Sequence, residues 1–129
     1  MERNAVGWFE IYVDDMTRAR TFYEAVFEVK LERLTAEGGE APDSLQMWAF
    51  RGDPDAGGAA GSIVKMDGCK AGGNSTIVYF SCADCAVEAA RAAANGGRIF
   101  KDKFSIGQYG YIALVEDTEG NLIGLHSMS

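Results

Sequence analysis

The chain has 129 residues, of which 47% are apolar and 24% charged, a mixture that excludes wholesale disorder and predicts one globular domain over residues 1–129. Its formal net charge is −7, and its lysines and arginines are scattered among acids, which argues against nucleic-acid or anionic membrane partners. Neither a run of 18 apolar residues nor a signal-peptide pattern occurs, so we expect a soluble, cytoplasmic protein whose partner is small.

The first half of the chain predicts one helix among four strands. Residues 6–13 (VGWFEIYV) are rich in aromatic and β-branched residues, which is typical of a strand. Asp14 and Asp15 are candidate N-caps for a helix over residues 16–27, where apolar residues recur at steps of three and four. Further strands are expected at 30–35, 45–50 and 59–66, with a loop at 38–42 and a turn at 53–58.

The second half repeats this order after a break at residues 71–74 (AGGN). A strand over 76–82 precedes Asp84, a candidate cap for an alanine-rich helix over 85–94 that Asn95-Gly96-Gly97 should end. Strands are expected at 98–103, 109–116 and 122–128. The order βαβββ thus occurs twice, which predicts an α+β fold of two tandem modules, at about 5–67 and 74–128.

The three cysteines do not indicate a disulfide framework, because their number is odd and no secretion signal accompanies them. Cys82 and Cys85 are spaced as Cys-x-x-Cys, but one such pair supplies only two zinc ligands. Asp84 between them disfavours a reactive thiolate, although the start of a helix would favour one. We therefore interpret them as small residues at a strand–helix junction rather than as a redox site.

Alternation along the strands assigns side chains to faces. In the first strand one face is apolar and suits the helix, whereas the other carries Trp8, Glu10 and Tyr12. A carboxylate is easier to accept on a wet cavity than in a dry core. The matching face of the strand over 76–82 carries Tyr79, and His126 in the last strand should face the same cavity.

Two polar side chains on these faces are candidate catalytic groups. If Glu10 lies in an apolar cavity, desolvation should raise its pKa and so suit it to act as a base. The alternative is a structural hydrogen bond to backbone or to a tyrosine. Histidine titrates near neutral pH, so His126 could carry a proton or contact a ligand; the alternative is an ordinary hydrogen-bonded histidine.

Other side chains are candidate ligand contacts. Aromatic rings could stack on a planar ligand, and the loop 105–110 (SIGQYG) could cover the mouth of a cavity. Each of these features also fits plain core packing or a simple strand connection. The candidate ligand-binding residues are Trp8, Tyr12, Trp48, Tyr79, Gln108 and Tyr109.

Two segments resemble the vicinal oxygen chelate superfamily, which includes glyoxalases, bleomycin-resistance proteins and extradiol dioxygenases. Residues 9–27 (FEIYVDDMTRARTFYEAVF) look like its opening strand, Asp-Asp cap and helix. Residues 104–127 (FSIGQYGYIALVEDTEGNLIGLHS) look like its closing loop, strand, Asp-x-x-Gly-Asn turn and strand. The resemblance implies curved mixed sheets with a helix on each convex face, whose concave faces enclose a cavity within one chain or across a dimer.

In the family's enzymes this cavity holds one divalent metal, which acts as a Lewis acid and is bound by His, Glu or Gln from the first and last strands of both modules. The resemblance places these ligand positions at Trp8, Gly61, Ile77 and Gly124. None of the four can bind a metal, and a hard divalent ion needs several oxygen or imidazole ligands. We therefore expect no metal cofactor at the usual site.

The first hypothesis is a glyoxalase/bleomycin-resistance-like homodimer that binds a small organic molecule in its cavity without the usual metal. A second is a metal-dependent lyase, isomerase or dioxygenase with shifted ligands such as Glu10 and His126. A third is a metal-free acid–base enzyme that uses Glu10 with His126. The fold alone does not select among them.

Overall fold

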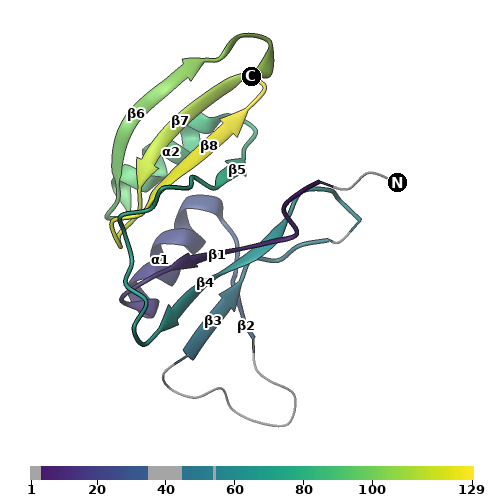
Figure 1. Cartoon of the computed structure of the whole chain (residues 1–129). Helices are drawn as coiled ribbons and strands as arrows, with labels where there is room; N and C mark the ends of the chain where they lie inside the picture. Colours follow the sequence, from purple (N-terminus) through teal and green to yellow (C-terminus); the bar gives the residue numbers. More distant parts are fainter. Residues whose placement is uncertain (1–3, 35–44, 54) are drawn as a thin grey trace.

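The two halves of the chain form two mixed four-stranded sheets (Figure 1), in a computed structural model that describes residues 4–34, 45–53 and 55–129. The strand order of the first sheet is β1 (Trp8–Tyr12), β4 (Ala60–Met66), β3 (Leu45–Ala49) and β2 (Glu32–Arg33). That of the second is β5 (Tyr79–Ser81), β8 (Leu122–Ser127), β7 (Tyr111–Glu116) and β6 (Arg98–Ser105). In each sheet the first pair is parallel and the others are antiparallel. The predicted α+β fold of two βαβββ modules is confirmed.

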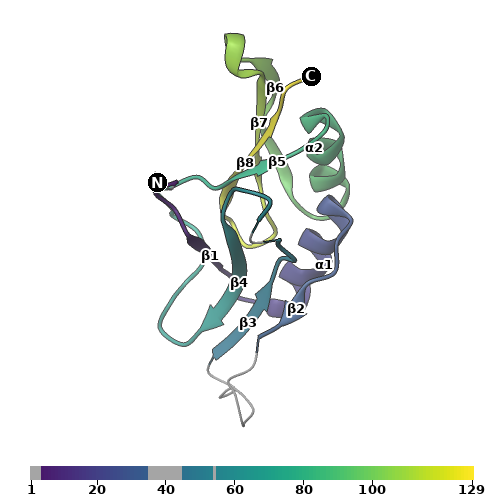
Figure 2. The ribbon, with the colours of Figure 1, turned by 90° about the vertical axis from the view of Figure 1, so that its right-hand side faces the viewer.

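The two helices, α1 (Met16–Phe27) and α2 (Cys85–Ala94), have the bounds predicted from the sequence. Asp15 and Asp84 each accept a hydrogen bond from a backbone N–H of the first turn at 3.0 Å, which caps the helix. Gly96 lies just beyond α2 with φ of 92°, a conformation that glycine adopts readily. Figure 2 shows both helices on the same side of the two sheets, which leaves the other faces of the sheets open.

One apolar core lies between the helices and the two sheets and includes residues of both modules. Phe80 of β5 stacks on Phe27 of α1 with the ring centroids 4.4 Å apart, and its ring lies 5.4 Å from that of Phe50. Packed aromatic pairs stabilise a core beyond the area that they bury. The modules therefore share one core rather than having one each.

The turn between β7 and β8 carries a buried carboxylate that reaches the other module. The Glu119 side chain has no exposed surface and accepts the backbone N–H groups of Asp14 and Asp15 at 2.9 Å each. Arg18 donates to both of its oxygens, at 2.6 and 2.9 Å. The Asp-x-x-Gly-Asn motif of the second module thus holds the start of α1 in the first.

Two more side chains of this turn bind the first module. Asp117 accepts a hydrogen bond from the Tyr23 hydroxyl at 2.6 Å in a buried contact. Burial raises the pKa of both groups. Asn121 donates to the Tyr12 carbonyl oxygen at 2.9 Å and accepts the N–H of Gly72 at 2.7 Å. The turn therefore fixes the end of β1 and the connection between the modules.

The structure differs from the sequence prediction at a few strand ends. The strand expected over 76–82 is paired as a strand only at β5, and the strand expected over 30–35 is reduced to β2. Residue 35 and the loop expected at 38–42 lie outside the described residues. In the part of the chain that the structure describes, no helix is long and apolar enough to cross a membrane.

Candidate functional site

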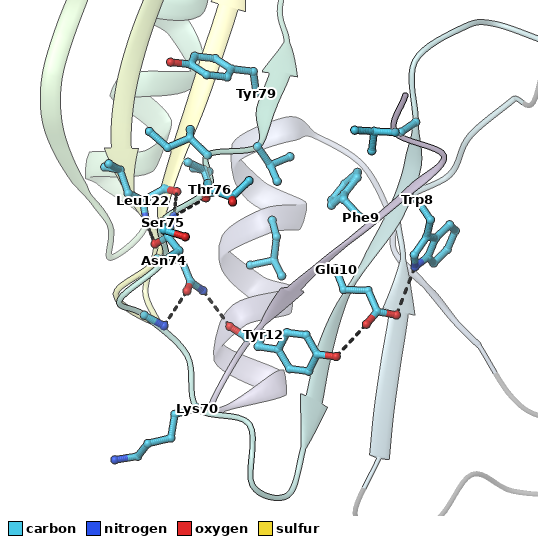
Figure 3. Close-up of a pocket in the computed structure, with 18 residues that line it drawn as sticks. Trp8, Phe9, Glu10, Tyr12, Lys70, Asn74, Ser75, Thr76, Tyr79 and Leu122 are labelled. Carbon is cyan, nitrogen blue, oxygen red and sulfur yellow. Dashed lines mark hydrogen bonds between the residues drawn. The ribbon is translucent and has the colours of Figure 1, made fainter. Parts of the chain in front are cut away.

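A cavity of about 700 Å³ lies between β1 and β5, the edge strands of the two sheets (Figure 3). Its lining comes mainly from β1, from residues 70–79, which connect the modules and reach the start of β5, and from residues 121–123 around the start of β8. This volume is typical of sites that enclose a small molecule. The place where the two sheets meet is therefore the candidate site.

On the β1 side of the cavity Glu10 lies between two aromatic side chains. Trp8 Nε1 donates to one carboxylate oxygen at 3.3 Å, and the Tyr12 hydroxyl donates to the other at 2.8 Å. The hydrogen bond to Glu10 and, to a lesser extent, burial raise the pKa of Tyr12, so its hydroxyl stays a neutral donor. The hydrogen bond to a tyrosine considered for Glu10 is present, but the side chain is exposed rather than desolvated.

The connection between the modules lines the cavity with polar residues that were not predicted from the sequence: Lys70, Asn74, Ser75 and Thr76. The Asn74 side chain donates to the carbonyl oxygens of Thr76 and Leu122 at 2.7 and 3.0 Å and accepts the N–H of Leu122 at 3.0 Å. It thereby fastens the connection to β8. The break at 71–74 could have indicated these residues. It marks the connection between the modules, and a connection between two facing sheet edges must pass along the cavity.

Half of the side chains predicted for the site line this cavity and half do not. Those that line it are Trp8, Glu10, Tyr12 and Tyr79. Those that lie elsewhere are Trp48, Gln108, Tyr109 and His126. Trp48 lies on the other face of its sheet, and His126 lies too far along β8. Gln108 and Tyr109 lie in the loop between β6 and β7.

Trp48 lies on the helix-facing side of the first sheet, which corrects the expectation that it faces a ligand. It pairs with Ile63, a core residue, and the guanidinium of Arg20 lies 3.5 Å from its ring centroid. A cation so close to an indole face is a favourable contact. Trp48 therefore packs under α1.

His126 lies toward the end of β8, whereas the cavity lies at its start. Its Nε2 is 2.6 Å from the carbonyl oxygen of Tyr109, in the short helix η1 (Gly107–Tyr109). The side chains of Gln108 and Tyr109 are exposed and do not reach the cavity. The structure therefore does not bring His126 to Glu10, and the loop 105–110 does not cover the cavity.

The register of β4 differs by one residue from the expectation. Gly61 faces the helices, whereas Ser62 pairs with Glu10 on the side of the sheet opposite the helices, where Ser62 is fully buried. Gly57 and Gly58 both have positive φ, so the sequence does not show which of them matches the turn glycine of the second module. Ser62, and not Gly61, thus occupies the position that corresponds to Gly124.

The side chains at the four metal-ligand positions do not fit a divalent metal. Trp8, Ser62, Ile77 and Gly124 offer an indole, a neutral hydroxyl, an alkyl group and no side chain. A Cβ at Gly124 would overlap the ring of Tyr79, which fills that place. Within residues 4–34, 45–53 and 55–129, no three His, Cys, Asp or Glu side chains form a group that could hold an ion.

The Cys-x-x-Cys pair lies at the junction of β5 and α2, away from the cavity. Burial, with Glu88 close by, raises the pKa of Cys82 to about 12, and Cys85 is fully buried. Because the thiolate is the reactive form, these surroundings do not suit a redox pair.

We expect Cys82 to react slowly with iodoacetamide in the folded protein at mildly alkaline pH. With a pKa of about 12, on the order of one thiol in ten thousand is ionised there. Mass spectrometry of the alkylated peptides over time measures the rate, and the half-buried Cys69 and the urea-unfolded protein serve as references. Modification of Cys82 at the unfolded rate would contradict the assignment.

This arrangement defines a class of protein: two tandem βαβββ modules that share a core and leave a cavity between their first strands. The family model described as Glyoxalase/Bleomycin resistance protein/Dioxygenase superfamily matches residues 5–125, and the chain belongs to this superfamily.

Solved structures share the fold at low sequence identity. A glyoxalase/bleomycin resistance protein from Albidiferax ferrireducens T118 has a TM-score of 0.68 and 22% identity, over 95% of this chain and 98% of that chain. A family enzyme from Burkholderia phytofirmans PsJN has a TM-score of 0.67 and 16% identity, over 95% and 98%. Glyoxalase I from Zea mays has a TM-score of 0.71 and 19% identity, over 93% of this chain and 44% of that one. No curated protein sequence matched.

Proposed function

We propose that this protein binds a small organic molecule in the cavity between β1 and β5, without the metal used by the family's enzymes. The observation that carries the proposal is the lining, in which aromatic rings lie on either side of a carboxylate, while the four metal-ligand positions carry no imidazole or carboxylate group. Trp8 is 44% exposed and Tyr79 46% exposed, so large rings face a cavity that a ligand would fill. Clefts with apolar walls and a few polar groups are typical ligand sites.

The two enzymatic hypotheses receive less support. A metal centre with shifted ligands needs Glu10 and His126 together, but His126 is engaged at the other end of β8. An acid–base pair of the same two residues meets the same difficulty. Binding requires only the side chains that line the cavity.

We further propose that the protein acts in the cytoplasm as a homodimer. Its three cysteines are free, which fits a reducing compartment. The Zea mays glyoxalase I chain is more than twice as long as the part that this chain covers, which supports pairing of two such units. Light scattering during gel filtration is expected to give twice the mass of 13.9 kDa, and a monomer at micromolar concentration would contradict the dimer.

Tryptophan fluorescence tests the binding function. The chain has two tryptophans, so Trp48→Phe leaves Trp8 in the cavity as the sole reporter. After dialysis against EDTA, we expect some members of a panel of aromatic small molecules to change Trp8 emission saturably and to raise the melting temperature. Added Ni²⁺, Zn²⁺, Fe²⁺ or Mn²⁺ should leave the affinity unchanged. A requirement for one stoichiometric metal ion would overturn the proposal.

A further inference from the structure

The carboxylate of Glu10 can bind a further group. Its oxygens accept one hydrogen bond each, from Trp8 and from Tyr12, whereas an ionised carboxylate offers about four acceptor positions. The side chain is exposed on the cavity wall, so the other positions are open to a ligand. Both hydrogen bonds orient the carboxylate before a ligand arrives, which lowers the entropy cost of binding.

The two rings beside Glu10 add a second attraction for positive charge. Figure 3 shows Trp8 and Tyr12 on either side of the carboxylate along β1. Both rings donate hydrogen bonds through groups in the ring plane, so these hydrogen bonds do not themselves occupy the ring faces. Indole and phenol faces carry negative potential and attract ammonium groups.

The other charges near the cavity do not oppose a cation at this place. Among the described side chains that line it, Glu10 is the one acidic residue and Lys70 the one basic residue. The Lys70 side chain extends away from the Glu10 carboxylate in Figure 3. The net charge of −7 also attracts cations over a longer range.

We infer that the ligand is an organic cation with a planar aromatic body, and that Glu10 binds its charged group between Trp8 and Tyr12. The body extends across the cavity toward Tyr79. This inference rests on the binding function proposed above. A divalent metal ion does not suit this position, because it needs several ligands and Glu10 is the single carboxylate among the described lining residues. An anion would be repelled by the same carboxylate.

Three acridines with one ring system test the preference for charge. Near neutral pH 9-aminoacridine is a cation, acridine is neutral and acridine-9-carboxylate is an anion. In titrations followed by their fluorescence, we expect 9-aminoacridine to bind about tenfold or more tightly than acridine, and the carboxylate to bind weakest. Added NaCl should narrow these differences, because it screens an exposed carboxylate.

Two matched variants assign the preference to one residue. Glu10→Gln removes the charge with little change of shape. In this variant we expect the affinities for 9-aminoacridine and acridine to lie within about threefold of each other. Glu32→Gln makes the same change at an exposed acid that pairs with Arg51 outside the cavity, so it should keep the preference. Trp8→Leu, which keeps the charge but removes one ring, should lower the preference in part.

The outcomes separate this inference from the broader function. If acridine binds as tightly as 9-aminoacridine, or if the preference survives Glu10→Gln in a folded variant, the cation assignment is wrong while small-molecule binding stands. If none of the three acridines binds, the assignment of a planar cation as the ligand is also wrong. The binding function is then decided by the panel of aromatic small molecules followed by Trp8 fluorescence. Tight Zn²⁺ or Mn²⁺ binding that Glu10→Gln abolishes would assign the carboxylate to a metal and overturn both proposals.

Discussion

Replacing Glu119 by alanine is expected to lower the free energy of unfolding by about 3–5 kcal/mol. The buried carboxylate accepts the N–H groups of Asp14 and Asp15 and two hydrogen bonds from Arg18. Alanine leaves these donors without their partner at the start of α1, where an unpaired buried polar group is costly. Urea unfolding followed by circular dichroism measures the loss.

An exposed ion pair provides the control for this variant. Glu116 pairs with Arg98 at 2.6 Å, but the arginine side chain is 70% exposed. Glu116→Gln should therefore cost less than about 1 kcal/mol. A loss at Glu119 no larger than the loss at Glu116 would show that the turn does not hold the modules together.

The same carboxylate should make the wild-type protein sensitive to acid. Burial opposes ionisation of Glu119, but hydrogen bonds from Arg18, the two backbone N–H groups and Thr118 outweigh it and lower its pKa from 4.5 to about 2. A carboxyl with a lowered folded-state pKa stabilises the fold above its unfolded-state value, and this stabilisation is lost as the pH falls through the folded-state value. Between pH 4.5 and about 2, the free energy of unfolding of the wild type should fall by about 2–3 kcal/mol more than that of Glu119→Ala.

The comparison of the wild type with Glu119→Ala also removes the contribution of Asp117, which opposes the loss of stability in acid. Burial raises the pKa of Asp117, so its protonation on acidification favours the folded state in both proteins and cancels in the difference. If the free energy of unfolding fell in parallel with pH for the wild type and Glu119→Ala, the loss of stability in acid could not be assigned to Glu119.

Replacing Phe80 by alanine is expected to cost about 2–4 kcal/mol. Its ring contacts the core across the boundary between the modules, against Phe27 and Phe50 of the first module. Alanine removes this contact and leaves space that the surrounding rings fill only in part. The free energy of unfolding in urea is the measurement.

Two further variants control the Phe80 measurement. Phe80→Leu keeps much of the volume and should cost less than about 1.5 kcal/mol. Phe100, which is 60% exposed on β6, should tolerate alanine within about 0.5 kcal/mol. Equal losses for Phe80→Ala and Phe100→Ala would show that the modules do not depend on a shared core.

The elements that could be predicted from the sequence are those with strong local signals. Asp15 and Asp84 cap helices whose apolar spacing is unambiguous, and both helices have the predicted bounds. Alternation in β1 placed Trp8, Glu10 and Tyr12 on one face, and all three line the cavity. The repeat of the pattern then gave the overall architecture.

The parts that could not be predicted depend on long-range geometry. Trp48 belongs to a strand whose face the sequence pattern did not assign, and it faces the core. His126 lies on a predicted strand, but alternation does not tell how far along that strand a cavity extends. Asn74 lies in irregular chain, where no periodicity reports orientation. The register of β4 depended on two adjacent glycines, Gly57 and Gly58, between which the local pattern did not distinguish.

Asn121 lines the cavity and also belongs to the turn that joins the modules. Its amide donates to the Tyr12 carbonyl oxygen and accepts the N–H of Gly72, so a substitution there would change the proposed ligand site and weaken the fold at the same time. Trp8 and Tyr79 are nearly half exposed and lie outside the core cluster, so substitutions there have a smaller structural cost. If the cavity binds a ligand as proposed, new specificities should therefore arise by substitution at Trp8 and Tyr79, while Asn121 stays under selection for folding.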